Sequence, residues 1–385
     1  MEVRKVMRLG MSSLVVSVPK EWADKYQLDS ESQLILIPQS DGSIALYPQT
    51  IPREKPRTIT LKTKPEDPSG LLERQMIAAY LTDFDEINIH SEGVISPELR
   101  ESLRNSLRLL TGYQIMESSS SHLLILNVAR VSEMDVERAL YRAHTISTSM
   151  LKDSLRALQN RDANMARTVI GLDEDVNQFY YLVNKQLRRA LLDPNIMSRI
   201  NITAIDAINF AMVLHAIHTA AEASKAIANA VLTLGNQDCP EDILKLALRN
   251  GQFATRLFED SAKAFLTRND SLANDVITRG GTCPPMRQQA ERLMESHLVK
   301  ICEDMLPTLT PEACSLFGPR QVALTVLEQV FQSNSQIAVA AATIAERAIW
   351  RALEIHQPPT KEIKPPVKKK GRKAAKSRSK KKDKD

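Results

Sequence analysis

The chain has 385 residues, of which 43% are apolar, 4% are aromatic and 12 are glycines, so it is long enough to bury a mainly aliphatic core without disulfide or metal staples. Its formal net charge of +5 is unevenly spread, because residues 357–385 hold 13 Lys/Arg and 3 Asp/Glu, whereas the preceding 356 residues hold 38 basic and 43 acidic groups. The sequence contains no GxxxxGK, GxGxxG, GxSxG or HExxH motif, which excludes the commonest nucleotide-binding and hydrolytic sites. We therefore predict a protein that is not an enzyme.

Cysteine spacing and apolar runs favour a cytoplasmic protein. The cysteines form no CxxC pair and no metal-ligand spacing, so we predict reduced thiols at Cys239, Cys283, Cys302 and Cys314. The N-terminus lacks the uninterrupted apolar run of a signal peptide. The most apolar stretch, 202–234, is interrupted by ionisable side chains, which predicts a buried helix and no membrane insertion.

Residues 1–50 have the pattern of a small β-rich domain. A helix is predicted to begin after Pro19, because proline suits a first helical turn. Asp41-Gly42 is a hairpin signal between two apolar runs. A unit of this size buries too little apolar surface to be stable alone, so we expect it to pair with a second copy or with another chain. The predicted strands are 4–8, 14–18, 34–38 and 43–47.

Residues 51–56 have the composition of a linker, and residues 57–130 that of a small α+β module. The periods of the apolar residues predict three strands and two helices in this module. The strands are expected at 58–62, 86–90 and 123–128, and the helices at 70–81 and 97–110.

From 132 to 356 the apolar pattern is helical throughout. Apolar and small residues recur every three or four positions over 202–234, which predicts one continuous helix of about nine turns. Long helices with short breaks form antiparallel bundles. The breaks are predicted at Pro194, Pro240, Gly280-Gly281 and Pro319.

The helical region contains a weak internal repeat. Segment 161–170 resembles 269–277, and segment 214–228 resembles 327–341, with offsets of similar size. This periodicity predicts two three-helix repeats, over 132–238 and 240–356. The remaining residues, 357–385, are rich in Lys, Pro and Ser and are predicted to form a disordered basic tail.

Two known families resemble parts of this chain. RKVMRLGMSSLVVSVPKEW, followed by DGSIALYP, is similar to the SpoVT/AbrB family of swapped-hairpin DNA-binding domains. Asp162, Met165-Ala166, Val169-Ile170, Asp173 and Val176-Asn177 match the first-repeat pattern of the PhoU family of phosphate-uptake regulators. The domain order resembles archaeal PhoU-like regulators. The implied fold is multidomain and mainly α, with an AbrB-like β domain, a small α+β module, a six-helix PhoU-like bundle and the basic tail.

The resemblance to PhoU also implies metal ligands, which this sequence has mostly lost. PhoU proteins carry a Glu-x-x-x-Asp motif on the third helix of each repeat, but the matching pairs here are His215 with Thr219 and Glu328 with Gln332. His215, His218 and Glu222 share one helix face, where they could hold a metal or form interhelical hydrogen bonds. We predict the second arrangement, and no metal site or cofactor. Asp173, Glu174 and Asp175 are interpreted as solvated or capping charges.

A DNA-binding surface is predicted in the first twenty residues. This segment has a net charge of +3, and dimerisation would bring about eight cations together, enough to neutralise several phosphates. The resemblance to AbrB implies that the serine hydroxyl groups of this segment also contact DNA and bind its phosphates. The alternative is an ordinary solvated strand edge with protective charges. The candidate DNA-binding residues are Arg4, Lys5, Arg8, Ser12, Ser13 and Lys20.

Two functions remain open. The first is a homodimeric DNA-binding regulator of phosphate uptake, in which the bundle receives its signal from a phosphate ABC transporter or a signalling kinase, because no phosphate pocket is legible in the bundle. The second is an adaptor that does not bind DNA, but docks on the cytoplasmic part of a phosphate ABC transporter and negatively regulates it. The basic tail could contact nucleic acid, anionic lipid or nothing at all.

Overall fold

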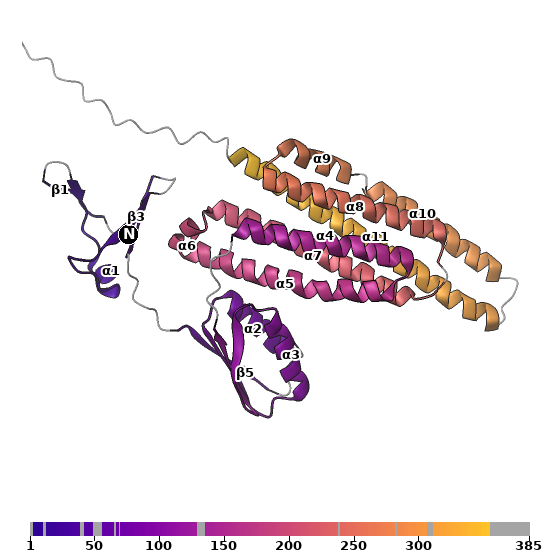
Figure 1. Cartoon of the computed structure of the whole chain (residues 1–385), viewed down its shortest axis with the longest axis horizontal. Coiled ribbons are helices and arrows are strands. Elements are labelled where there is room, and N and C mark those ends of the chain that lie inside the picture. The colour runs from indigo at the N-terminus through magenta and orange to yellow at the C-terminus, as the bar shows by residue number, and fades with distance from the viewer. Residues whose placement is uncertain are drawn as a thin grey trace, which may run out of the picture.

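The structure is a computed structural model of the whole chain. It describes residues 3–10, 13–38, 42–48, 56–64, 67–68, 70–128, 135–237, 239–281, 283–305 and 311–354. The predicted basic tail, Ser12 and Asp41 lie outside these residues. Three parts follow one another along the chain: a small β-rich unit, an α+β module and a helical bundle (Figure 1).

The N-terminal unit consists of two separate β-hairpins with one short helix between them. Strand β1 (Met7–Leu9) pairs antiparallel with β2 (Ser13–Val15), and β3 (Leu34–Pro38) pairs antiparallel with β4 (Ile44–Pro48). Helix α1 (Lys20–Lys25) follows Pro19, as predicted. The first two strands were predicted too long, because each can extend only as far as its partner, and they share just three residue pairs.

Within its described residues, the N-terminal unit has no apolar core of its own. Neither of the two clusters of buried apolar residues in the described chain includes a residue before Ile59. Side chains that should be buried are instead exposed, for example Leu9 by 65%, Leu14 by 69% and Leu36 by 59%. The apolar residues of this unit therefore remain available to a partner surface.

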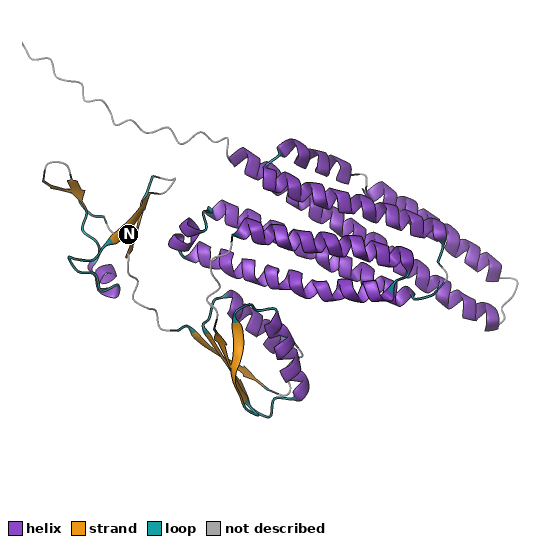
Figure 2. Cartoon of the chain, viewed as in Figure 1, coloured by secondary structure: helices purple, strands orange, loops and turns teal. Residues whose placement is uncertain are grey.

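The α+β module has a four-stranded sheet in the order β5-β6-β8-β7, with β5 and β6 parallel and the other pairs antiparallel. Helices α2 and α3 cover one face of this sheet (Figure 2). The predicted helices and three of the four strands are confirmed. The fourth strand, β7, was missed because only Tyr113 of its six residues is buried. The elements are β5 (Thr58–Thr63), α2 (Leu71–Leu81), β6 (Glu86–Ser91), α3 (Pro97–Arg108), β7 (Tyr113–Ser118) and β8 (His122–Asn127).

The bundle is helical from α4 to α11. Its helices are α4 (Val136–Asn160), α5 (Ala163–Leu192), α6 (Pro194–Arg199), α7 (Ala204–Leu234), α8 (Glu241–Thr267), α9 (Asp270–Gly280), α10 (Cys283–Met305) and α11 (Pro311–Glu354). Three of the predicted breaks are confirmed, since Pro194 opens α6, Pro240 caps α8 and Gly280 ends α9. The break at Pro319 is wrong, because α11 already begins at Pro311 and continues through it. The packing of the long remainder of α11 against α7 and α8 outweighs the helix-breaking tendency of one proline.

The internal repeat is visible in the caps of the helices. Arg161 is the C-cap of helix α4 and Arg268 that of α8, and both arginines adopt the left-handed conformation. The next residues, Asp162 and Asn269, then cap α5 and α9 with their side chains. The first repeat thus consists of α4, α5 and α7, with the short α6 between the last two. The second consists of α8, α9 with α10, and α11, so its middle helix is divided near Gly280.

Helix α7 is long and apolar enough to cross a membrane by length and composition alone, so the expectation that its polar residues exclude a span was too strict. Half of its most apolar window is buried inside the protein, however. It packs against α4, α5 and α11, which makes it the central helix of the bundle.

The close packing of three helices can be tested at Gly251 in α8. A β-carbon at this position would lie 2.5 Å from Leu155 Cδ2 on α4 and 3.0 Å from Asn334 Oδ1 on α11. Gly251→Ala is expected to lower the free energy of unfolding by about 1–3 kcal/mol, measured by chemical denaturation. Gly171→Ala in α5 is the control, because no atom lies within 4 Å of its added β-carbon, and it should stabilise the helix by about 0.5–1 kcal/mol. Equal effects at the two sites would contradict this packing.

Candidate functional site

The predicted DNA-binding residues lie on the exposed surface of the N-terminal unit. Arg8 and Ser13 belong to the β1–β2 hairpin, where Arg8 faces Leu14 and Ser13 faces Leu9 across the strands. Lys20 begins α1, which lies at the base of this hairpin, away from its turn (Figure 1). Because neighbouring side chains of a strand point to opposite faces, Arg8 and Ser13 lie on the same hairpin but on opposite faces of it, and Lys20 lies on another element. The other described candidates, Arg4 and Lys5, precede β1 and are exposed.

A buried lysine joins the α+β module to the bundle. Lys185 of α5 is 7% exposed, and its ammonium lies 3.1 Å from Asp83 Oδ1 in the turn that follows α2. The same ammonium lies 4.3 Å and 4.5 Å from the ring centres of Tyr80 and Tyr113, within cation–π distance. Burial lowers the pKa of Lys185, and the Asp83 carboxylate opposes that shift. Arg189, one turn further along α5, also binds Asp83, at 3.0 Å.

The sequence contains no indication of this contact between the module and the bundle. Its residues are distant along the chain, and none of them belongs to a recognisable local motif. A second contact supports it on α3, where Gln178 of α5 donates a hydrogen bond to the Arg108 carbonyl at 3.1 Å. Together the two contacts hold both helices of the module against one bundle helix.

A polar network crosses from α5 to α7 near these contacts. Lys225 Nζ donates to Asp173 Oδ2 at 2.6 Å, and Asn177 Nδ2 donates to the same oxygen at 3.0 Å. Asn177 Oδ1 in turn lies 2.8 Å from His218 Nε2, so the amide orientation makes that imidazole nitrogen the donor. Burial lowers the pKa of His218. The interhelical hydrogen bond predicted for His218 is confirmed.

Asp173 corrects one prediction. It is 4% exposed and lies in the middle of α5, so it is neither a solvated nor a capping charge. A buried carboxylate requires compensation, which Lys225 provides. Glu174 and Asp175 are exposed, as expected.

A metal of the kind that the PhoU resemblance implies does not fit this network. The position beside the Asp173 carboxylate is taken by the Lys225 ammonium, and His218 directs a proton toward Asn177. His215 is exposed and shares no carboxylate with them. Within the described ranges, no group of three His, Cys, Asp or Glu side chains is placed to hold a metal ion.

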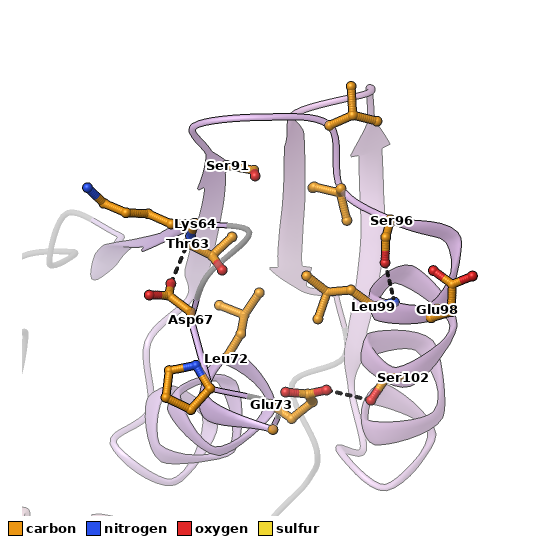
Figure 3. Close-up of a pocket in the computed structure, with 14 residues that line it drawn as sticks. Thr63, Lys64, Asp67, Leu72, Glu73, Ser91, Ser96, Glu98, Leu99 and Ser102 are labelled. Carbon is orange, nitrogen blue, oxygen red and sulfur yellow. Dashed lines mark hydrogen bonds between the residues drawn. The ribbon is translucent and has the colours of Figure 1, made fainter.

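The α+β module contains a cavity of about 470 Å³ between α2 and α3 (Figure 3). It lies where the parallel strands β5 and β6 end, at Thr63 and Ser91, a position that suits ligand binding in α/β sheets. Leu72 and Leu99 line it, and Ser102 donates a hydrogen bond to Glu73 beside them.

Charge decides what this cavity can accept. Its lining includes the carboxylates of Asp67, Glu73 and Glu98. The lysine on its wall, Lys64, is paired with Glu92 at 3.1 Å. The cavity therefore favours a neutral or cationic small molecule over a phosphate ion.

Comparison with known proteins identifies the first helical repeat. Residues 140–231, which run from α4 into α7, match the PhoU domain. A search of curated proteins finds no match to the chain.

Among solved structures, PhoU from Pseudomonas aeruginosa is 18% identical, with a TM-score of 0.46, over 57% of this chain and 96% of its own. The phosphate transport system regulatory protein PhoU from Streptococcus pneumoniae is 16% identical, with a TM-score of 0.44, over 56% of this chain and 92% of its own. The match to the PhoU domain is confined to residues 140–231.

The contact between the α+β module and the bundle predicts that Lys185 contributes more to stability than the neighbouring Arg189. Lys185→Met should lower the free energy of unfolding by about 1–3 kcal/mol and speed hydrogen exchange in α2, because a buried ion pair and two ring contacts are lost. Arg189→Met, whose side chain is 45% exposed, should cost less than about 1 kcal/mol. Denaturation combined with hydrogen-exchange mass spectrometry measures both. A larger cost for Arg189→Met would contradict the assignment of Lys185 as the main contact.

Proposed function

We propose that this protein is a cytoplasmic, homodimeric regulator of phosphate uptake that binds DNA through its N-terminal unit and receives its signal through the helical bundle. The single observation that carries the regulatory part is the PhoU domain over residues 140–231. The solved protein from Streptococcus pneumoniae is described as a phosphate transport regulatory protein, which supports extending this role to the present chain.

Dimerisation through the N-terminal unit is supported by its exposed apolar surface. Ten large apolar side chains between residues 3 and 48 are exposed in the single chain, far more than a 50-residue unit can leave in water. Both hairpins also end in unpaired strand edges in the described chain. A second copy of the same unit would cover both features, and the resemblance to swapped-hairpin domains favours that partner. These side chains are Val3, Val6, Met7, Leu9, Leu14, Val16, Ile35, Leu36, Ile44 and Leu46.

Dimerisation would also double the cations available to DNA. Arg4, Lys5, Arg8 and Lys20 are exposed in each copy. In a dimer these side chains could contact several phosphates at once, and each contact adds affinity that falls with rising salt. The Ser13 hydroxyl, on the opposite face of the hairpin from Arg8, could contact a separate phosphate. The signal would enter through a protein partner of the bundle, since the cavity in the α+β module disfavours phosphate.

A second candidate function is an adaptor that does not bind DNA, and one observation favours it. Apolar side chains are exposed where the start of α7 meets the end of α11, two helices joined by a 3.4 Å hydrogen bond from Asn209 to Glu354. Such a face suits a partner protein, for example the cytoplasmic part of a transporter. Partner capture that survives removal of residues 1–50 would favour this function. The side chains are Ile205, Ile208, Met212, Trp350 and Leu353.

The dimer is tested by placing a charge on the exposed apolar surface. Leu36→Glu is expected to convert the protein from dimer to monomer in sedimentation experiments, because the carboxylate would be buried without a partner in the dimer. Leu36 is 59% exposed in the single chain, so the fold of each copy should persist. Val339→Glu is the control, since Val339 is 66% exposed on α11 and should leave the dimer intact. A dimer that persists in Leu36→Glu would place the interface elsewhere.

DNA recognition is tested at two cations on different elements. Arg8→Ala combined with Lys20→Ala is expected to abolish sequence-specific binding to the upstream region of the protein's own gene, measured by fluorescence anisotropy. Lys62→Ala combined with Arg104→Ala removes two exposed cations from the α+β module, and it should leave specific binding within twofold. Unchanged specific binding in the first variant would refute the predicted site.

A further inference from the structure

A cleft of about 710 Å³ separates the α+β module from the bundle. One wall is α3, with Glu98 and Glu101, and the opposite wall is α5, with Asp173 and Glu174. Lys225 of α7 is the cation among the described residues that line the cleft, so their formal charge is −3. A water-filled cleft with one sign of charge concentrates mobile ions and segments of the opposite sign.

The wall formed by Asp173 shows that this negative charge is not fully compensated. Lys225 lies 2.6 Å from Asp173 and 3.9 Å from Glu222, so a single ammonium serves two carboxylates. Asp173 is 4% exposed, yet its Oδ1 atom accepts no hydrogen bond from any described residue. Burial and the Asp173 charge together raise the pKa of Glu222. The cleft therefore already holds one ammonium group, and the exposed carboxylates of Glu98, Glu101 and Glu174 keep its lining negative.

The chain itself carries a segment of matching charge. Residues 357–385 have 13 Lys/Arg and 3 Asp/Glu, and they begin three residues after Glu354, where α11 ends. Glu354 contacts Asn209 of α7, and Lys225 lies 16 residues further along that helix, a distance of about 24 Å. Lys368 is 14 residues further along the chain than Glu354, a separation that can span about 46 Å when extended, so the lysine-rich segment can reach the cleft.

We propose that the lysine-rich segment 361–384 of the chain itself occupies the acidic cleft between α3 and α5. Tethering gives this segment an effective concentration in the millimolar range, which favours it over free cations that bind weakly. The lysines held in the cleft cannot bind a polyanion at the same time. The contact therefore weakens the non-specific binding of nucleic acid by this segment. The selection of a binding site then depends on the rest of the protein.

The contact is tested directly by zero-length carbodiimide crosslinking of the full chain, followed by mass spectrometry. Lysines of segment 361–384 are expected to crosslink to Glu98, Glu101 and Glu174, and the crosslinks should fade as salt rises from 50 to 500 mM. Exposed carboxylates of the second repeat, at Glu291, Glu295 and Glu328, should crosslink at most a few per cent as often. Equal yields at the two sets of carboxylates would overturn the proposal.

The consequence for polyanions is tested with heparin, which requires no DNA recognition by the N-terminal unit. Replacing Glu98, Glu101 and Glu174 with Gln should release the segment and raise heparin affinity at least threefold in the full chain. The same triple replacement in residues 1–356 should have no comparable effect. The matched control replaces Glu291, Glu295 and Glu328 with Gln, and should change affinity less than 1.5-fold in the full chain. An equal rise in the control, or in the tail-less protein, would show that only net charge is being measured and would overturn the proposal.

Discussion

The buried Lys185 ammonium is the constraint on which the relation between the α+β module and the bundle depends. An ammonium removed from water needs a carboxylate and further polar or aromatic contacts, and Asp83, Tyr80 and Tyr113 supply them from the module. Because these three groups come from α2, its following turn and β7, the module can satisfy Lys185 only when it is folded and correctly oriented. The orientation of the module in turn sets the position of α3 beside α5, and so creates the acidic cleft between them.

The bundle provides a rigid support for this arrangement. Its two repeats place α7 and α11 side by side at the centre, and small buried residues such as Gly251 allow the neighbouring helices to approach closely. The middle helix of the first repeat, α5, is unbroken over 30 residues and carries both Lys185 and Asp173. The corresponding helix of the second repeat is divided near Gly280. The repeat with the unbroken helix is thus the one that contacts the module and that matches the PhoU domain.

Local patterns in the sequence were sufficient for most of the fold. The helix predicted over 70–81 is α2 (Leu71–Leu81), and the strand predicted over 34–38 is β3, because apolar periodicity and turn residues report backbone conformation directly. Strand β7 was not predicted, because an edge strand with one buried residue shows little alternation of apolar and polar residues. The helix break predicted at Pro319 is wrong, because tertiary packing can outweigh the local tendency of proline to end a helix. The sequence pattern includes Asp173 but does not show that it is buried, and it gives no sign of Lys185, since a buried charge is recognisable only when its partner on another element is known.

The account as a whole depends on whether the N-terminal unit reads DNA sequence. The most direct measurement compares binding of residues 1–356 to the upstream region of the protein's own gene with binding to a scrambled duplex of equal length, at moderate salt. Removing residues 357–385 eliminates a segment of net charge +10 that would bind any polyanion. The account predicts that a clear preference for the upstream region survives. Equal binding to both duplexes, or no binding to either, would contradict it and favour an adaptor whose N-terminal unit serves only to dimerise.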